Sequence, residues 1–449
     1  MGSQPSPDDL ITHLKHVLVE LNAHPYPNIP NPPETPKRAS VALILRVQPN
    51  YSHWPVSSDQ PSDLQSEQHR HSSPASDAAP KPSVKDTLDT FFDQDWVKHG
   101  DPELLFIKRA AREGDKWNGH VALPGGKRDP EDASDQDTAA REALEEVGID
   151  LNVHNAIPVG NLPQRVVTTS WGKVPLMVLC PYLYLLTAPA YPSQRLQPTE
   201  VASTHWVPLR ALQAPGLRTH EHADVSARLA RSELGIKRWF LQGMLSKMMF
   251  AAIRLVPANS TYCATIPGFV PEEVDSPAAK TQPPPLLLWG LTLGVVSDLL
   301  EHLPPHNALE LWTYPTFTHY DVRAIMWALS YRFRKQKARE LSTAVEDTTT
   351  AGTEQEVTDL PVAPEEDLEK GKEGYKPGEV GIAGLGLGRH WGRTGRVKMM
   401  ARGAAVNSLL EGYYPIVRKA VALALVGRVT AIAVLAAWAF RFYHRRRVQ

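Results

Sequence analysis

Cysteine is scarce in this chain of 449 residues, which contains two. Cys180 lies in an apolar run and Cys263 in a polar stretch, and neither belongs to a CxxC or Cys/His spacing. A disulfide framework needs several cysteines, and a zinc–cysteine site needs closely spaced ligands. The sequence therefore argues against both kinds of site and favours a reducing compartment.

An excess of charge of either sign is also missing. The 48 basic and 49 acidic residues leave a formal net charge of −1, so the composition does not indicate a nucleic-acid-binding surface. The opening stretch MGSQPSPDDLITHL lacks the basic and apolar regions of a secretory signal. We therefore expect an intracellular protein with no nucleic-acid partner.

Proline, by contrast, is abundant, with 40 residues gathered in clusters. Polar Ser/Pro-rich stretches bury too little apolar surface to offset the entropy lost on ordering, so we expect them to be disordered. They divide the chain into a helix with a Pro-rich spacer (1–37) and one globular domain (38–303) with a disordered insertion at about 51–85. An accessory helix (304–340), a disordered linker (341–396) and a C-terminal helical segment (397–449) follow.

Hydrophobic patterns predict the elements of these segments. Helices are expected at 8–22, near 137–147, at 286–303 and at 320–340. Strands are expected at 39–47, 104–107, 155–160, 173–187 and 201–207. The 286–303 stretch contains Asp298 and Glu301, which favours a core helix over a membrane span.

The chemically informative segment begins at the pair Gly125-Gly126 and continues into the 137–147 helix. On that helix Glu142, Glu145 and Glu146 stand at i, i+3 and i+4, so their carboxylates share one face. Such carboxylates repel each other unless a cation neutralises them, and Mg²⁺ or Mn²⁺ prefers oxygen ligands. For the helix alone, an ordinary acidic surface helix is the alternative.

The surrounding positions complete the pattern. Arg141 is spaced to pair with Glu145 one turn later, and Gly148 is placed to end the helix with a left-handed cap. The glycine-rich turn before the helix lets backbone atoms approach a ligand without obstruction by a Cβ. Three apolar positions are expected to face the core: Ala140, Leu144 and Val147. Loop and helix together favour a metal site.

The stretch REALEEVGI, residues 141–149, resembles the second half of the Nudix box, REUxEExGU with U apolar, at every fixed position. In the first half, counted from Gly126, the acidic position holds Asp132, and Arg141 comes one residue later than in the general box. This longer loop, with PGGK at 124–127 and TAARE at 138–142, resembles the coenzyme A diphosphatase branch of the family.

Two flanking segments bear on that branch. The stretch LWGLT at 288–292 resembles the WGxT helix that closes such domains. The His-x-Gly that precedes the box in this branch is replaced by WNGH at 117–120. The resemblance covers about residues 38–303 and implies an α+β fold, the Nudix α/β/α sandwich with a mixed central sheet, here with disordered insertions and a C-terminal helical tail.

The resemblance also implies roles for individual residues. Divalent-metal ligands are expected at Glu142, Glu145, Glu146 and the carbonyl of Gly126. Arg141 would orient the carboxylates, and Glu142 carries base-like duty in the family. Glu200, just before a strand, is an alternative base, with a surface or capping role as its own alternative. Substrate phosphates would meet three basic side chains: Lys127, Lys108 and Arg109.

The activity implied is Mg²⁺- or Mn²⁺-dependent hydrolysis of a diphosphate bond. Coenzyme A or an acyl-CoA, cleaved to a phosphopantetheine and an adenosine bisphosphate, is the leading substrate. Another nucleoside diphosphate derivative, such as ADP-ribose, a dinucleotide or an oxidised nucleotide, is the alternative. A non-catalytic Nudix-fold binding protein at a membrane is a third hypothesis of a different class.

The C-terminal stretch 420–440 is apolar and long enough, at 1.5 Å per residue, to cross a membrane core of about 30 Å. Arg428 near its middle opposes insertion, whereas the basic flanks and Trp438 favour a membrane. A spanning anchor, a helix lying in the interface and a helix packed on the domain all remain open. An anchor would place the protein on an organelle membrane, peroxisomal or mitochondrial; without one we expect it in the cytoplasm.

Overall fold

The computed structural model describes residues 7–55, 83–112, 117–153, 155–168, 174–224, 247–263, 285–305, 308, 312–350, 410 and 412–447. Within these residues the framework is a nine-stranded sheet with the strand order β11-β8-β2-β1-β7-β5, to which β3, β4 and β6 are added at β2, β1 and β7. The pair β1–β7 is parallel and the other pairs are antiparallel, so the sheet is mixed. Its strands are β1 (Arg38–Gln48), β2 (Asp101–Arg109), β3 (Val121–Ala122), β4 (Gly125–Lys127), β5 (Ala156–Asn161), β6 (Arg165–Thr168), β7 (Pro175–Leu186), β8 (Val201–Pro208) and β11 (Asn259–Tyr262).

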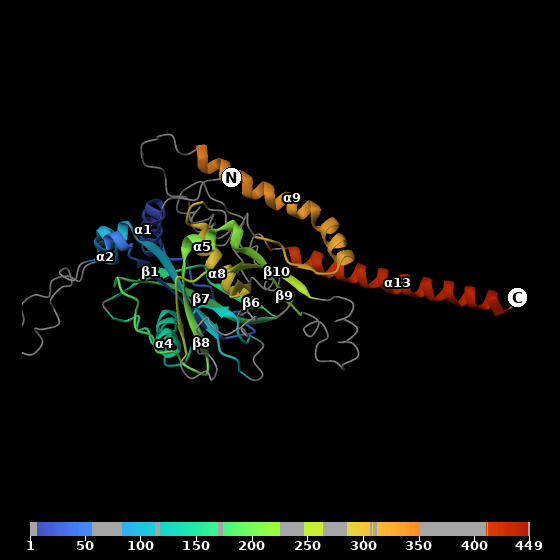
Figure 1. The fold of residues 1–449 in the computed structure, drawn as a ribbon, viewed down its shortest axis with the longest axis horizontal. Coiled ribbons are helices and arrows are strands. Elements are labelled where there is room, and N and C mark those ends of the chain that lie inside the picture. Colours follow the sequence, from blue (N-terminus) through green and yellow to red (C-terminus); the bar gives the residue numbers. More distant parts are fainter. Residues whose placement is uncertain are drawn as a thin grey trace, which may run out of the picture.

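The two faces of this sheet carry separate apolar cores, because alternate residues of each strand point to opposite sides. Leu105 and Ile107 of β2 pack with the helix α4 (Asp135–Val147) on one face. Leu104 and Phe106 pack on the other face with α1 (Pro7–Ala23), α2 (Val84–Phe92), α3 (Asp95–Lys98), α5 (Leu209–Gln213) and α8 (Gly290–Glu301). Figure 1 shows α4 on one side of the sheet, with α1, α2 and α8 on the other. The result is the α+β sandwich with a mixed sheet that the sequence predicts.

The N-terminal helix belongs to the domain. Leu14, Leu18 and Leu21 of α1 are fully buried in the larger core, and the side chain of Asn22 donates to the carbonyl of Val159 on β5 at 2.8 Å. The apolar stripe of α1 therefore covers the sheet of the domain that the sequence predicts from residue 38.

A second, four-stranded sheet was not foreseen from the sequence. It has the order β12-β10-β13, with β9 paired to β10, over β9 (Arg218–Ala223), β10 (Met248–Arg254), β12 (Leu287–Trp289) and β13 (Thr316–Phe317). The first residues of the expected 286–303 helix form β12, and the helix begins at Gly290. The aliphatic stretch 286–303 is thus divided between an edge strand and a helix, and the hydrophobic periodicity of the sequence does not indicate where the division lies.

The predicted disordered segments fall mostly outside the described residues, which lack 56–82 and 351–409. At the margins of these segments the chain is ordered. A short 3₁₀ helix, η1 (Tyr51–His53), follows β1, and α2 begins at Ser83 with a capping box to Asp86. The helix α9 (Tyr320–Thr350) continues ten residues into the predicted linker, 341–350.

The C-terminal helix α13 (Tyr413–Arg447) has two unlike halves. Its first half packs on α9 and the second sheet through Tyr413, Val417 and Ala420, and Arg428 pairs there with Asp321 of α9 at 2.5 Å. From residue 429 to 446 every residue is exposed, and the helix projects away from the body of the molecule (Figure 1). It is the one described helix that is long and apolar enough to cross a membrane.

Candidate active site

The helix α4 begins and ends where the sequence predicts. Ser134 caps its N-terminus by accepting from the backbone N–H of Asp137 at 3.1 Å, which satisfies one of the unpaired amides of the first turn. Gly148 ends it with φ of 73°, a left-handed conformation that disfavours a side chain. The helix packs against β1 and β4, so its carboxylate face lies over the Gly125–Lys127 strand.

Glu146 is a buried carboxylate in this site. It is 3% exposed, and one of its oxygens accepts from the backbone N–H of Gly125 at 2.9 Å. The pKa of Glu146 is raised to about 8, chiefly by burial and in part by the neighbouring charges of Glu142 and Glu200, against the lowering effect of the Gly125 hydrogen bond. Arg109 lies close enough to lower it. The negative charge is therefore poorly compensated within the protein.

Glu142 lies directly over Gly126. A Cβ built on Gly126 would come within 2.5 Å of both carboxylate oxygens of Glu142, so a side chain at this position would displace the carboxylate. Burial raises the pKa of Glu142, and the charges of Glu145 and Glu200 add to this against the opposing effect of Arg141. Gly126 is thus needed for the close approach of the loop to the carboxylate.

Arg141 holds the loop to the helix. Its guanidinium donates to both oxygens of Asp132 at 3.0 and 3.1 Å, to Glu142 at 3.0 Å and to the Lys127 carbonyl at 3.0 Å. The hydrogen bond from Arg141 lowers the pKa of Asp132 to about 2. Asp132 thus pairs with Arg141 across the loop that is one residue longer than the general box.

Glu145 points away from the buried pair. Its side chain is 58% exposed and accepts from Arg141 at 3.0 Å, the pairing that the spacing predicts. The prediction that Leu144 faces the core is wrong, because Leu144 is 47% exposed, whereas Ala140 and Val147 are buried. The face that packs on the sheet is centred on Ala139, Ala143 and Glu146, which turns Leu144 and Glu145 toward solvent.

Glu200 comes to the site from a different element. It directly precedes β8, and its backbone carbonyl accepts from the N–H of Ala110 at 2.8 Å, which fixes it beside the end of β2. Its charge acts on both Glu142 and Glu146, and Arg112 lies 3.8 Å from its carboxylate. The structure therefore brings this residue close to Glu146 and Glu142, which are 54 and 58 residues away in the sequence.

The three basic candidates are not equivalent. Arg109 lies near Glu146, whereas the charge of Lys108, the preceding residue on β2, lowers the pKa of His205 on β8. The register shift between them adds a residue to β8 and none to β2, so the alternation of β2 continues from Ile107, which faces α4, and puts Lys108 and Arg109 on opposite faces of the sheet. Lys127 is exposed at the end of β4, and its backbone carbonyl accepts from Arg141. Arg109 is therefore the basic candidate whose charge acts on a carboxylate of the site, whereas Lys127 contributes its backbone carbonyl and Lys108 acts elsewhere.

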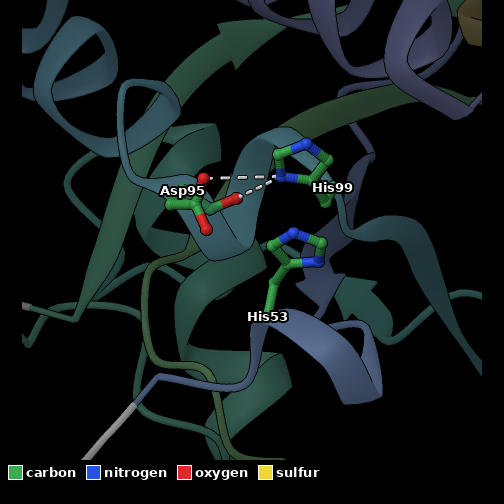
Figure 2. Close-up of side chains that lie close together, drawn as sticks. All are labelled: His53, Asp95 and His99. Carbon is green, nitrogen blue, oxygen red and sulfur yellow. Dashed lines mark hydrogen bonds and ion pairs between the residues drawn. The ribbon is translucent and has the colours of Figure 1, made fainter.

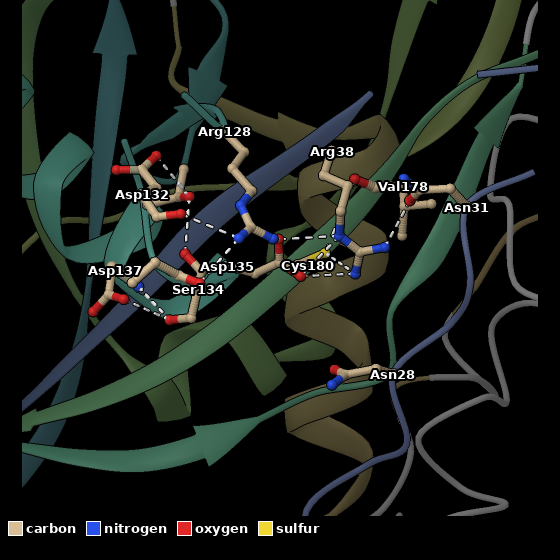
Figure 3. Close-up of polar contacts among 12 residues, drawn as sticks. Asn28, Asn31, Arg38, Arg128, Asp132, Ser134, Asp135, Asp137, Val178 and Cys180 are labelled. Atoms are coloured by element: carbon tan, nitrogen blue, oxygen red, sulfur yellow. Dashed lines mark hydrogen bonds and ion pairs between the residues drawn. The ribbon is translucent and has the colours of Figure 1, made fainter. Parts of the chain in front are cut away.

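A network that sequence reasoning missed anchors the other end of the loop (Figure 3). Asp135, in the first turn of α4, accepts from Arg38 of β1 at 2.8 Å and from Arg128 at 3.2 Å. Arg128 also donates to the carbonyls of Asp132 and Ala133, and Arg38 donates to the sulfur of Cys180 at 3.2 Å. An acidic residue in a first helical turn was the available signal for Asp135; nothing local marks Arg38.

The donor set fits a hard divalent cation. Glu142 and Glu146 lie beside the Gly125-Gly126 backbone, and Glu200 adds a third carboxylate charge. A Cβ at Gly126 would occupy the space between this backbone and the carboxylate of Glu142. Carboxylate oxygens with an unbalanced negative charge are the environment that Mg²⁺ and Mn²⁺ occupy in proteins.

Comparisons with known proteins agree with this geometry. The NUDIX domain model matches residues 96–229. An uncharacterized protein of Schizosaccharomyces pombe is 38% identical over 239 residues, which cover 52% of this chain and 67% of that protein. A protein of Yersinia pestis (strain Pestoides F) named as the uncharacterized Nudix hydrolase NudL is 40% identical over 81 residues, 18% of this chain and 39% of that protein.

Among solved structures, the NUDIX domain of Shewanella oneidensis NrtR in complex with ADP ribose is similar at 14% identity, with 41% of this chain and 81% of that chain covered and a TM-score of 0.23. The match to the NUDIX domain model decides the assignment. The chain belongs to the Nudix hydrolase family, whose members act on phosphoanhydride bonds.

Proposed function

We propose that this Nudix enzyme hydrolyses the diphosphate bond of coenzyme A or an acyl-CoA, releasing a phosphopantetheine and an adenosine bisphosphate. The observation that carries hydrolysis is the pair of the partly buried Glu142 and the buried Glu146, which lie against the Gly125-Gly126 backbone with too little positive charge around them. The longer loop with PGGK and TAARE supports coenzyme A as the substrate.

The proposed reaction is attack of water on one phosphorus of the diphosphate. A new P–O bond forms, the bridging P–O bond breaks, and the proton of the water goes to a carboxylate base. A bound Mg²⁺ or Mn²⁺ would supply charge neutralisation of the phosphate oxygens. Glu142, Glu146 and the Gly126 carbonyl would hold it, with Glu145 as a further ligand.

The chain's own residues supply the rest. Arg141 fixes Glu142 and the loop carbonyl of Lys127, so that the carboxylate is presented in one orientation. We propose Glu200 as the base, because its charge acts on Glu142 and Glu146, with Glu142 as the alternative within the same cluster. Arg109 and Lys127 are proposed to pair with substrate phosphates. The proposed contribution of Lys108 is indirect, because it lies on the other face of the sheet.

Product analysis tests the substrate. Coenzyme A and ADP-ribose are incubated separately with the protein and Mn²⁺, and the products are separated by chromatography. We expect adenosine bisphosphate from coenzyme A at a higher kcat/KM than products from ADP-ribose. Faster cleavage of ADP-ribose would replace coenzyme A by the alternative substrate class. No cleavage of either, nor of a dinucleotide, would favour the non-catalytic binding protein.

We further propose that residues 429–443 insert into a membrane. The apolar residues there are exposed on all sides of the helix, including Ile432, Leu435 and Trp438, whereas a helix that packs on a protein needs one apolar stripe. Arg441 lies near the end of this segment and Arg445 and Arg446 follow it, as expected beside anionic lipid. Arg428, which opposes insertion in the sequence, is instead paired with Asp321 on the docked half.

The segment 429–443 is short for a helix that crosses the whole membrane. Its 15 residues extend about 22 Å at 1.5 Å per residue, less than the hydrocarbon core of about 30 Å. Fractionation of cells with carbonate washing tests the proposal and separates its two forms. Retention in the pellet indicates a spanning anchor on an organelle membrane, release by the wash indicates an interfacial helix, and a cytosolic protein before any wash contradicts both.

A further inference from the structure

Two histidines and a carboxylate lie together at the end of β1 that is remote from α4 (Figure 2). His53 ends η1, just after β1, while Asp95 begins α3 and His99 caps its C-terminus. At the other end, Val41 of β1 pairs with Gly125 at the candidate active site. Seven residues of strand separate Val41 from Gln48, about 23 Å at 3.3 Å per residue, so this cluster is a separate feature.

The backbone that carries the three side chains is held firmly. Gln48 at the end of β1 pairs with Asp101 at the start of β2. A Cβ on Gly100, between His99 and that pair, would lie 2.2 Å from the Cγ1 of Val47, so α3 presses against β1 at the closest approach that a glycine allows. Trp96 and Val97 of α3 are buried in the core. The separation of the histidines is therefore set by the fold.

The polar atoms of the cluster lie close together. One ligand atom from each of the three residues lies within 4.8 Å of those of the other two. The imidazole rings stack with centroids 4.0 Å apart and planes 12° apart, and the Nδ1 of His99 is 3.6 Å from the carboxylate of Asp95. The Nδ1 of His53 is buried and has no hydrogen-bond partner among the described residues, an arrangement that costs free energy unless a ligand satisfies it.

We propose that His53, Asp95 and His99 form a binding site for Zn²⁺. Two imidazoles and one carboxylate are a donor set of borderline softness that zinc takes with water in the remaining position. Tetrahedral zinc with bonds of about 2.0–2.1 Å needs donor atoms about 3.4 Å apart, so the rings must turn out of their stack to converge. Binding through Nδ1 of His99 also replaces its hydrogen bond to the Asp95 carbonyl, 3.0 Å long.

The site differs from the carboxylate cluster in the metal that it selects. Nitrogen donors favour Zn²⁺ and Co²⁺ over Mg²⁺, whereas Glu142 and Glu146 offer oxygen atoms suited to Mg²⁺. Zinc would join the exit of β1 to α3, which stabilises this corner of the domain against unfolding by mass action. It takes no part in the diphosphate reaction, because the active site lies at the other end of β1.

Co²⁺ titration of the full-length Glu146→Gln protein tests the site, since this background weakens metal binding at the carboxylates. We expect one equivalent of Co²⁺ with visible d–d absorption, displaced by Zn²⁺ and insensitive to millimolar Mg²⁺. His53→Ala and His99→Ala should each remove that equivalent and the thermal stabilisation by Zn²⁺. The matched control is His24→Ala, since His24 also faces a carboxylate four residues earlier, Glu20 at 4.0 Å.

An unchanged Co²⁺ spectrum and stoichiometry in both His53→Ala and His99→Ala would overturn the proposal. Loss of the signal in His24→Ala as well would also overturn it, because it would show nonspecific binding to surface histidines. Circular dichroism of each variant without metal establishes that it is folded. Where His53→Ala is unfolded, His53→Gln provides the same test, since glutamine keeps polarity and lacks the imidazole.

Discussion

Two charged clusters flank the same glycine-rich loop, and they differ in whether their charges are balanced. Asp135 faces two guanidinium groups, those of Arg38 and Arg128. Around Glu142 and Glu146 the cations Arg141 and Arg109 face further carboxylates as well, and burial raises the pKa of both residues. A balanced cluster holds a fold together, whereas an unbalanced buried one needs a ligand to complete it. The comparison favours a structural role for the first cluster and supports the proposed metal-dependent chemistry of the second.

The largest expected effect is the loss of hydrolysis in Glu146→Gln. Glutamine keeps the shape and can still accept from the Gly125 N–H, but it removes the charge that a divalent cation requires. We expect turnover to fall by about 10³-fold or more at saturating Mn²⁺, with the unfolding midpoint unchanged or raised. Steady-state kinetics and thermal unfolding measure both. Near-normal turnover would contradict the assignment; Glu131→Gln, an exposed carboxylate on the same loop, is the control.

The second prediction concerns stability at the balanced cluster. Asp135→Asn leaves Arg38 and Arg128 facing a neutral side chain in a largely buried place, so we expect a loss of about 3 kcal/mol in the free energy of unfolding. Urea denaturation measures it. The exposed Asp137, in the same helical turn, is the control: Asp137→Asn should cost less than about 1 kcal/mol. Equal losses in the two variants would mean that the network contributes nothing beyond the helix N-terminus.

Whether the sequence could predict a feature depends on whether the contacts that form it are local or long-range. Helical spacing correctly placed Glu142 and Glu146 on the face of α4 that meets the loop, because 3.6-residue periodicity is local, but Glu145, predicted to share that face, is turned to solvent. The spacing also failed for Leu144, because burial depends on which stripe the sheet covers. The Arg38–Asp135 pair joins residues 97 positions apart, and only the register of β1 with β4 brings them together. Long-range pairing also explains why the second sheet and the packing of α1 on the first sheet were missed.

The third prediction concerns pH. The folded-state pKa of Glu146, about 8, lies above its usual value of 4.5 because of burial. The protonated carboxyl therefore stabilises the metal-free protein fully below about pH 4, and this contribution is lost as the pH rises through 8. In excess chelator we expect the wild-type midpoint to fall more steeply than that of Glu146→Gln between pH 5 and 9. Parallel curves would show that ionisation of Glu146 does not destabilise the folded protein.

The smallest expected effect compares the adjacent cations Arg109 and Lys108. Arg109 lies near Glu146, and Lys108 lies near His205 on the opposite face of the sheet. A guanidinium beside the carboxylates can pair with a substrate phosphate, a contact worth about 1.5–3 kcal/mol for a charged hydrogen bond. We therefore expect Arg109→Gln to lower kcat/KM by about tenfold or more and Lys108→Gln to lower it by less than about threefold. The two substitutions remove the same charge from neighbouring positions on one strand, so a difference between them reflects the face of the sheet. Equal losses would mean that Lys108 reaches the substrate around the strand end, and the division between the two faces would then fail as a guide to function.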